Sequence, residues 1–342
     1  MKSTEDVVEL RCPFPTAINI HAAAANQHML AWAMEFGLIA RQTPESPELH
    51  KINYGWLGAR VHPTASLEAL QIATEWQCWL FCGDDQNDEE EIGYQPGILA
   101  QAHSRYLEIL DGKSPTREDS AATHALAELC ARLRRCASPE CLRRFRQRVK
   151  DYFMAIRWEA QNRAMSIIPN PSLYCKMRLD TSAVYTCFEL IDITEEIDLP
   201  VAVRDHADIQ ALGRMANNIT SWCNDIVSLP KELQHGDVHN LVIVLQHHHQ
   251  RSLTQALGQA AAMHNAEVAS YLALQSSLPA FGEVVSEQLE RHLSGLRAWM
   301  RGNMDWGTTT RRYATGAPAR EPQNESALAD AVHALPVRLA GF

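Results

Sequence analysis

The chain has 342 residues, of which 46% are hydrophobic, and its formal net charge is −10 at pH 7. The acidic balance argues against a nucleic-acid partner, which requires a basic surface, and no apolar run is long enough to predict a membrane-spanning helix. Residues Met1–Asp6 lack the character of a signal peptide, and the nine cysteines form no close CxxC pair. We therefore expect reduced thiols and a cytoplasmic location.

The first predicted element of note is a helix that leads into Asp84. Its apolar residues recur at helical spacing: Leu67, Leu70, Ala73, Trp76 and Leu80. Six carboxylates follow between residues 84 and 91. Asp84 and Asp88 continue the apolar stripe if the helix continues, because each lies four residues after the previous member. An acidic run is more often a solvated face, and this alternative stays open.

Carboxylates crowded in this way raise one another's pKa unless a cation lies among them. Mg²⁺ is the usual cation for oxygen ligands. When Mg²⁺ is bound by one or two carboxylates, water and phosphate oxygens usually fill its remaining positions. The acidic segment therefore suggests a site for a phosphorylated ligand.

Three longer segments, residues 118–165, 203–229 and 253–301, also have helical patterning, and strand-type alternation is not sustained. We predict an all-α protein with one large hydrophobic core or two smaller ones. Residues 316–342 change character, with a glycine and two prolines ahead of an Ala- and Leu-rich stretch. We expect them to form a mobile or lightly packed tail.

A second polar motif lies near residue 228. Asn224, Ser228 and Glu232 stand at positions i, i+4 and i+8, which places them on one side of a helix with a drift of about 80°. An amide oxygen, a hydroxyl and a carboxylate form an oxygen-ligand set for a hard cation, although such a triplet alone is more often an exposed stripe. Lys231 adds a cation that could meet phosphate. Pro230 removes an amide donor and predicts a kink or an end of the helix within the motif.

Together these motifs resemble those of the bacterial class I terpene synthases. Asp84-Asp85-x-x-Asp88 is followed about 140 residues later by Asn224-Asp225-Ile226-x-Ser228-x-x-Lys231-Glu232. Other segments similar to the family are Cys12–Pro15, Trp32–Leu38, Gly236–Val242, and Trp306 ahead of Arg312-Tyr313. The resemblance covers residues 10–315, and the motifs occur in the family's order and at its spacing.

The resemblance implies a single helical bundle, the class I terpenoid synthase fold, around a deep apolar cavity with both metal motifs at its mouth. The catalytic domain would span residues 1–315. The resemblance implies a Mg²⁺-dependent cyclisation with three ions. In this reaction an isoprenyl diphosphate, farnesyl diphosphate by default, becomes a sesquiterpene hydrocarbon or alcohol with release of diphosphate. Homodimers are common in the family, but the sequence carries no separate signal for one.

The resemblance also assigns roles to individual residues. The metal ligands would be Asp84, Asp88, Asn224, Ser228 and Glu232, with Glu89 as the alternative distal acid of the first motif. The groups on the diphosphate would be Arg178, Lys231, Arg312 and Tyr313. Asp85 would hold an arginine when the site closes. Thr181 and Ser182 match the positions at which a helix break presents a main-chain carbonyl to the cavity, although the family often has glycine where Ser182 stands.

Ionisation of the diphosphate would leave an allylic carbocation, which requires a dry pocket with aromatic walls. The candidates for this wall are Trp76, Phe81, Phe153, Phe188 and Trp306, although core packing explains each of them equally well or better. Trp306 is the preferred candidate because it precedes the Arg-Tyr pair at the family's spacing.

Other functions stay open at this point. Substrate length is not readable, so a monoterpene or diterpene synthase is an alternative. A chain-elongating prenyltransferase shares the metal chemistry but would carry a second aspartate-rich motif in place of Asn224–Glu232. More distant alternatives are a catalytically silent diphosphate-binding protein and a metal protein based on His247-His248-His249. Three adjacent helical histidines point in different directions, which disfavours the last alternative.

Overall fold

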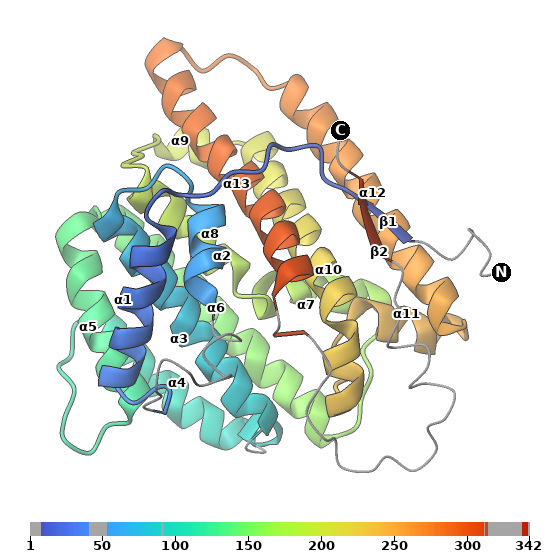
Figure 1. Ribbon diagram of the computed structural model, residues 1–342, viewed down its shortest axis with the longest axis horizontal. Coiled ribbons are helices and arrows are strands. Elements are labelled where there is room, and N and C mark those ends of the chain that lie inside the picture. Colours follow the sequence, from blue (N-terminus) through green and yellow to red (C-terminus); the bar gives the residue numbers. More distant parts are fainter. Residues whose placement is uncertain (1–7, 41–52, 90–91, 311, 314–336, 341–342) are drawn as a thin grey trace.

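The computed structural model describes residues 8–40, 53–89, 92–310, 312–313 and 337–340, without the side chains of 86–89 and 337–340. The elements are arranged as shown in Figure 1. In chain order they are β1 (Val8–Arg11), α1 (Ala22–Glu35), α2 (Tyr54–Val61), α3 (Leu67–Glu89), the 3₁₀ turn η3 (Ile92–Tyr94), α4 (Pro96–Leu110), α5 (Ala121–Cys136), α6 (Pro139–Ala164), α7 (Pro171–Thr181), α8 (Val184–Thr194), α9 (Val201–Arg204), α10 (Ala207–His235), α11 (Leu241–His249), α12 (Leu253–Ser276), α13 (Glu283–Thr309) and β2 (Val337–Ala340).

The helices close into a ring around a central space. Helix α10 packs against α13, α13 against α2, α2 against α3, α3 against α8, and α8 against both α10 and α7 (Figure 1). Helix α5 packs against α3, α4 packs against both α5 and α6, and α11 and α12 pack against α10. The all-α prediction is confirmed, and the ring brings α3, α7, α8 and α10 to one place.

Two glycines allow α2 to lie close to its neighbours. A Cβ atom at Gly55 would come within 2.4 Å of the Asn26 Cα on α1. A Cβ atom at Gly302 on α13 would come within 2.9 Å of the backbone of Arg60. Since neither contact leaves room for a side chain, α2 is held tightly between α1 and α13.

The predicted helical segments are divided by local capping signals. Residues 118–165 form α5 and α6, because Ser138 caps the backbone N–H of Cys141 and Pro139 occupies the first helical position. Residues 253–301 form α12 and α13, with an interruption at 277–282. The patterning thus predicted the helical state but missed these boundaries.

Helix α10 continues through Pro230, so the expected end of the helix at that residue is wrong. The helix runs to His235 and ends at Gly236, whose φ of 70° is left-handed. The N–H of Asp237 then donates to the carbonyl of Glu232 at 3.1 Å. The proline loses one backbone hydrogen bond, but Ser228 and Leu229 are buried just before it, and Leu233 packs partly buried against the core after it, so tertiary packing maintains the helix.

The two short strands were not predicted. β1 and β2 pair in parallel, with Val8 opposite Val337 and Leu10 opposite Leu339, and β1 packs on α12 (Figure 1). Val8-Glu9-Leu10-Arg11 alternates apolar and polar residues, but a single run of four residues lies at the lower limit of the strand signal. β2 lies within the predicted tail, whose residues 316–336 and 341–342 fall outside the described residues.

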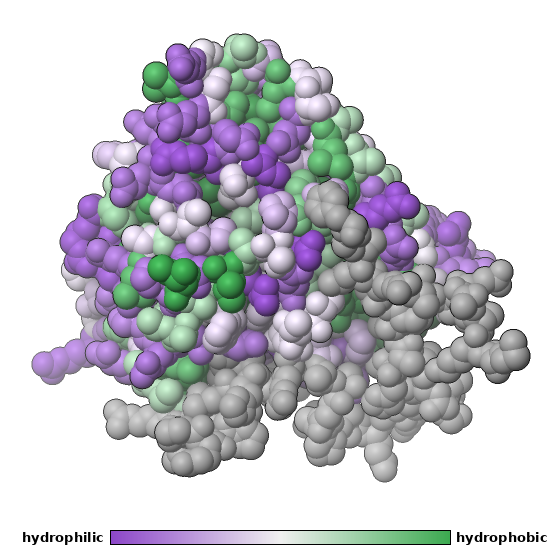
Figure 2. Space-filling view, turned by 45° about the horizontal axis from the view of Figure 1, so that its top comes forward, coloured by the Kyte–Doolittle hydropathy of each residue, from purple (hydrophilic) through white to green (hydrophobic). Residues whose placement is uncertain are grey.

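Polar residues predominate on the surface. Figure 2 shows a face on which hydrophilic residues are widespread and hydrophobic residues gather in small groups. Among the described helices, none combines the length and the apolar character that a membrane span requires.

Candidate active site

Two hollows meet where α3, α7, α8 and α10 converge. The main cavity has a volume of about 140 Å³, and a polar hollow beside it has a volume of about 100 Å³. Five residues line both: Phe81, Asp84, Arg178, Thr181 and Asn224. The two hollows therefore adjoin one another in one site. Apart from the shared residues, the main cavity is lined by apolar and neutral polar side chains, and the polar hollow carries charged groups.

The second metal motif lies on one face of α10, as its spacing predicts. The Ser228 hydroxyl contacts the Glu232 Oε1 at 2.5 Å and the Asn224 carbonyl at 2.7 Å. The Asn224 side chain accepts a hydrogen bond from Arg178 Nη2 at 3.0 Å and donates one to the Tyr313 hydroxyl at 2.8 Å. All three motif residues line the polar hollow.

Glu232 lies in an electrostatic environment that suits a cation. Burial, together with the charges of Asp225 and Asp237, raises the pKa of the Glu232 carboxyl to about 8. A positive ion in contact with this carboxylate would favour its charged form. The donors present at this face are an amide oxygen, a hydroxyl and a carboxylate, which fit a hard, oxygen-preferring ion such as Mg²⁺.

The first metal motif stands opposite, at the end of α3. Asp84 has a half-exposed side chain and lies 3.1 Å from Arg312 Nη2. Asp85 accepts a hydrogen bond from Arg312 Nη1 at 2.8 Å, and Lys231 Nζ lies 3.4 Å from its other oxygen. Burial alone would raise the pKa of Asp85, but the Arg312 and Lys231 charges outweigh it and lower that pKa. The side chain of Asp88, like that of Glu89, lies outside the described residues, so the distal ligand of this motif stays a prediction.

Arg178 reaches the same hollow from the last turn of α7. Its Nε lies 2.9 Å from Asp225 Oδ1, and its Nη2 lies 2.7 Å from the same oxygen. The expected helix break follows. Ala183 adopts a left-handed φ of 58° between α7 and α8, and Ser182 lines the main cavity just before it. The Thr181 hydroxyl is buried there with no hydrogen-bond partner among the described residues.

Asp225 is the main site residue that sequence reasoning missed. It is fully buried and accepts hydrogen bonds from Arg178, from the Tyr174 hydroxyl at 2.7 Å, and from the backbone N–H of Leu241 at 3.0 Å. Asn240 is a second such residue, because it donates to Glu232 Oε2 at 2.7 Å. Both lie within the quoted motifs, but their roles depend on partners from other elements.

Trp306 packs against residues that line the site. Its ring lies 5.7 Å from that of Phe81 and 5.8 Å from that of Tyr313, and its Nε1 donates to the Asn53 side chain at 3.0 Å. Trp306, predicted for the cavity wall, lines neither the main cavity nor the polar hollow. The cation of Arg312 lies 4.6 Å above the Phe81 ring, which makes Phe81 the contact between the aromatic group and the charged part of the site.

Of the five aromatic residues predicted for the cavity wall, Phe81 lines the main cavity and the other four do not. Trp76 faces away from the main cavity, since its Nε1 donates to Thr186 at 2.9 Å and its ring stacks on Trp79. Phe153 lines a separate hollow behind α3. The aromatic residues that do line the main cavity with Phe81 are Tyr152 and Trp299. Residue type suggested the candidates, but the packing of each helix decides which side faces the cavity.

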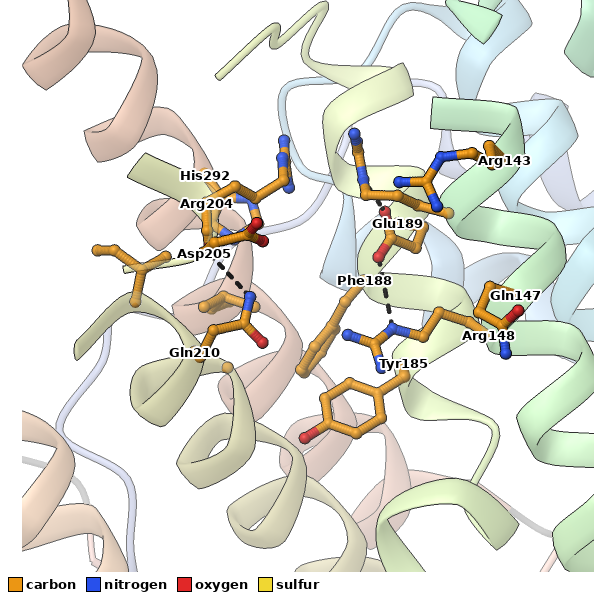
Figure 3. Close-up of a pocket in the computed structure, with 14 residues that line it drawn as sticks. Arg143, Gln147, Arg148, Tyr185, Phe188, Glu189, Arg204, Asp205, Gln210 and His292 are labelled. Atoms are coloured by element: carbon orange, nitrogen blue, oxygen red, sulfur yellow. Dashed lines mark hydrogen bonds and ion pairs between the residues drawn. The ribbon is translucent and has the colours of Figure 1, made fainter. Parts of the chain in front are cut away.

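Phe188 lines a third hollow, of about 300 Å³, between α6, α8, α9, α10 and α13 (Figure 3). Oppositely charged groups there pair with one another: Arg144 lies 2.9 Å from Glu189 and 3.0 Å from Asp192, and Arg148 lies 3.6 Å from Glu189. No residue of either metal motif lines it. This hollow is larger than the main cavity, but its ion pairs are satisfied internally, and it is separate from the site.

The histidine alternative receives no support. His247, His248 and His249 are exposed at the end of α11. Throughout the described ranges, no three His, Cys, Asp or Glu side chains gather closely enough to hold a metal ion.

Comparisons with known proteins agree with this geometry. The chain is 44% identical over 309 residues to (+)-T-muurolol synthase ((2E,6E)-farnesyl diphosphate cyclizing) of Roseiflexus castenholzii, covering 90% of this chain and 94% of that protein. It is 35% identical to germacrene A synthase of Nostoc punctiforme, covering 89% of this chain and 94% of that protein. Its fold is similar to that of germacradien-4-ol synthase from Streptomyces citricolor, with a TM-score of 0.78, 24% identity and coverage of 90% and 100%.

The profile of terpene synthase family 2, C-terminal metal binding, matches residues 75–270. This range exceeds half of the chain and includes both metal motifs and the helix break between α7 and α8. The chain therefore belongs to terpene synthase family 2.

Proposed function

We propose that the protein is a Mg²⁺-dependent sesquiterpene synthase that ionises farnesyl diphosphate and cyclises the carbocation to a hydrocarbon or an alcohol. The observation that carries the proposal is the adjacency of the two hollows: oxygen donors and cations line one, and a cavity with aromatic, aliphatic and neutral polar walls adjoins it. The choice of farnesyl diphosphate is supported by the name of the Roseiflexus castenholzii relative.

The polar hollow would hold the diphosphate. Arg178, Lys231, Arg312 and Tyr313 all line it, and they contribute three positive charges and a phenol donor. Guanidinium groups bind phosphate oxygens in a bidentate manner, which fixes the orientation of the leaving group. Their concentrated charge would stabilise the negative charge that develops as the carbon–oxygen bond breaks.

The oxygen donors of the hollow would hold the metal. Asp84, Asn224, Ser228 and Glu232 would bind Mg²⁺, which when present neutralises charge on the departing diphosphate. Asn240 would keep the Glu232 carboxylate in place through its hydrogen bond to Oε2. Asp88 completes the proposed ligand set.

The main cavity would hold the isoprenoid chain. Phe81, Tyr152 and Trp299 present aromatic groups to it, and such groups stabilise carbocations without acting as strong bases. The remaining wall combines aliphatic residues such as Leu57, Leu80 and Val184 with neutral polar residues, namely Gln77, Ser182, Thr220, Ser221 and Asn303. The isoprenoid chain would have to displace water from this cavity, which protects the cation until cyclisation.

Four parts of the proposal rest on the family resemblance: a requirement for three Mg²⁺ ions, a homodimer, a cytoplasmic location, and a catalytic domain that spans residues 1–315. Thr181 and Ser182 would act at the helix break, where both residues line the main cavity.

The test is product analysis by gas chromatography–mass spectrometry. Purified protein is incubated with Mg²⁺ and, in separate reactions, with geranyl, farnesyl and geranylgeranyl diphosphate, with a chelator control for each. We expect a cyclic C15 product from farnesyl diphosphate that disappears with the chelator. Conversion of geranyl or geranylgeranyl diphosphate alone would reassign the substrate. Diphosphate binding without any product would indicate a silent binder, and longer chains after addition of isopentenyl diphosphate would indicate a prenyltransferase.

A further inference from the structure

The hollow that Phe153 lines lies on the other side of α3 from the main cavity. It has a volume of about 130 Å³ and is enclosed by α3, α4, α5 and α6. Its lining includes Trp79, Leu99, Ala102 and Phe153. We call it the rear hollow. Because its volume is close to the 140 Å³ of the main cavity, the two together would offer nearly twice the space.

Two residues separate these spaces. Leu80 on α3 and Tyr152 on α6 line both the main cavity and the rear hollow, and no other described residue lines both. Both side chains are at least nine-tenths buried. We call this pair the Leu80–Tyr152 wall.

The rear hollow has the chemistry of a hydrocarbon site. Its aromatic rings pack on one another, with His103 stacked 4.2 Å from Phe153 and Trp79 lying edge-on 5.1 Å from Tyr106. Trp79 Nε1 is already bonded to the carbonyl of Ala122 at 2.9 Å. Burial and the nearby Arg157 charge lower the pKa of His103 to about 4, so its ring is neutral at physiological pH. No charged side chain lines the rear hollow within the described part of the chain.

The distance of the wall from Asp84 also bears on the length of the isoprenoid chain that fits. Leu80 precedes Asp84 by one helical turn, which is about 6 Å along the axis of α3. A diphosphate held beside Asp84 therefore directs its chain into the main cavity, past the face of α3 that carries Leu80. A chain with one more isoprene unit would need space beyond that face.

We infer that the Leu80–Tyr152 wall sets the upper limit on isoprenoid chain length, and that opening it admits a C20 diphosphate whose last isoprene unit occupies the rear hollow. This inference rests on the proposed function, since it concerns the substrate of the same site. It identifies two specificity-determining residues that neither metal motif contains.

The experiment measures kcat/KM for farnesyl and geranylgeranyl diphosphate and compares their ratio between variants. Leu80→Ala and Tyr152→Leu open the wall from its two sides. Each is expected to raise the C20-to-C15 ratio on the order of tenfold or more, since even a single methylene changes discrimination by about this factor. Leu80→Val is a smaller truncation that keeps the test available if Leu80→Ala fails to fold.

Leu99→Ala is the matched control. It removes the same atoms from another buried leucine, which lines the rear hollow but not the main cavity. It should enlarge the rear hollow without opening the wall and should leave the ratio unchanged. In a double variant with Leu80→Ala, Ala102→Leu should refill the rear hollow and reverse the gain in C20 turnover.

Several results would overturn the inference. One is that the Leu80→Ala and Tyr152→Leu variants both fold and convert farnesyl diphosphate, yet keep the wild-type C20-to-C15 ratio of kcat/KM. Others are an equal gain in Leu99→Ala, or a wild-type enzyme that already converts both substrates equally well. More alcohol from farnesyl diphosphate without C20 turnover would show that the wall excludes water instead. Wild-type activity on farnesyl diphosphate reports separately on the proposed function, whose failure would remove this inference as well.

Discussion

Arg312 and Asp85 form an ion pair in which Nη1 of the arginine lies 2.8 Å from Oδ2 of the aspartate. The pair joins the turn after α13 to the end of α3, and the arginine side chain is only 7% exposed. The same guanidinium donates to the Tyr54 hydroxyl at 2.9 Å and lies over Phe81. The charged part of the site is therefore closed by contacts between residues more than 200 positions apart.

A double-mutant cycle of Asp85→Asn and Arg312→Lys should show that these two residues stabilise the folded protein jointly. We expect a coupling in the free energy of unfolding of about 1–3 kcal/mol, because the arginine is buried and makes several contacts. Urea denaturation of the wild type, the two single variants and the double variant measures this coupling. The pair Arg143–Glu140, with side chains 67% and 41% exposed, serves as the control and should show a much weaker coupling, because solvent screens both charges. Equal coupling in both pairs would contradict the closing role of Arg312.

Asp225→Asn should destabilise the protein strongly. The substitution leaves the buried Arg178 guanidinium without its anionic partner, which costs about 3–5 kcal/mol. Asp111→Asn is the matched control, because it breaks an ion pair with Arg146 on the surface and should cost about 1 kcal/mol or less. Chemical denaturation compares the two variants. Similar losses would mean that the Arg178–Asp225 pair contributes no more than a surface contact.

Mg²⁺ and inorganic diphosphate together should raise the melting temperature. A ligand present at 100 times its Kd stabilises the folded state by about 2.7 kcal/mol. Asn224→Ala and Ser228→Ala should each reduce the shift, and Mg²⁺ alone should give a smaller one, because diphosphate supplies further oxygen ligands. Differential scanning fluorimetry checks this without any turnover. Full shifts in both variants would remove these residues from the metal site.

Stability should fall as the pH drops below about 6.5, and His62 should contribute to the loss. Burial lowers the pKa of His62 to about 3, so the unfolded chain binds a proton between pH 3 and 6.5 that the folded protein does not. This stability is present above pH 6.5, and about 2 kcal/mol of it is lost by pH 5. His62→Gln should make the slope of stability against pH shallower by up to about 1.4 kcal/mol per pH unit. An unchanged slope would contradict the buried neutral state.

Phe81→Leu should change the product distribution, because Phe81 lines the main cavity. Trp76→Phe should leave that distribution unchanged, since Trp76 packs against Trp79 and Thr186 outside the cavity. Trp306→Ala should instead cost stability, about 3–5 kcal/mol for a large buried aromatic side chain. Product analysis and denaturation separate the two effects. A product shift in Trp76→Phe comparable to that in Phe81→Leu would refute this division of roles.

The sequence was most informative where function depends on one helix. The positions of Asn224, Ser228 and Glu232 follow from the helical repeat alone, and the structure places all three in one hollow. Asp225 was missed because its partners Arg178 and Tyr174 lie 47 and 51 residues away. No periodicity within α10 carries information about them.

The aromatic wall was harder to predict for a related reason. Trp76 and Leu80 belong to the same apolar stripe of α3, yet Leu80 reaches the main cavity and Trp76 does not. A helix in the interior of a bundle is apolar on several sides, so hydrophobic spacing does not distinguish the side that faces a cavity from the side that faces another helix. The identities of Tyr152 and Trp299 as lining residues therefore depend on tertiary packing.

The pairing of β1 with β2 has a consequence for biosynthesis. The two strands are separated by more than 300 residues, so β1 leaves the ribosome long before its partner exists. Loop closure over such a distance is slow, and domains fold while synthesis proceeds. We expect the helical bundle to assemble first and the strand pair to form as a late step, with the edge of β1 exposed on the nascent chain until then.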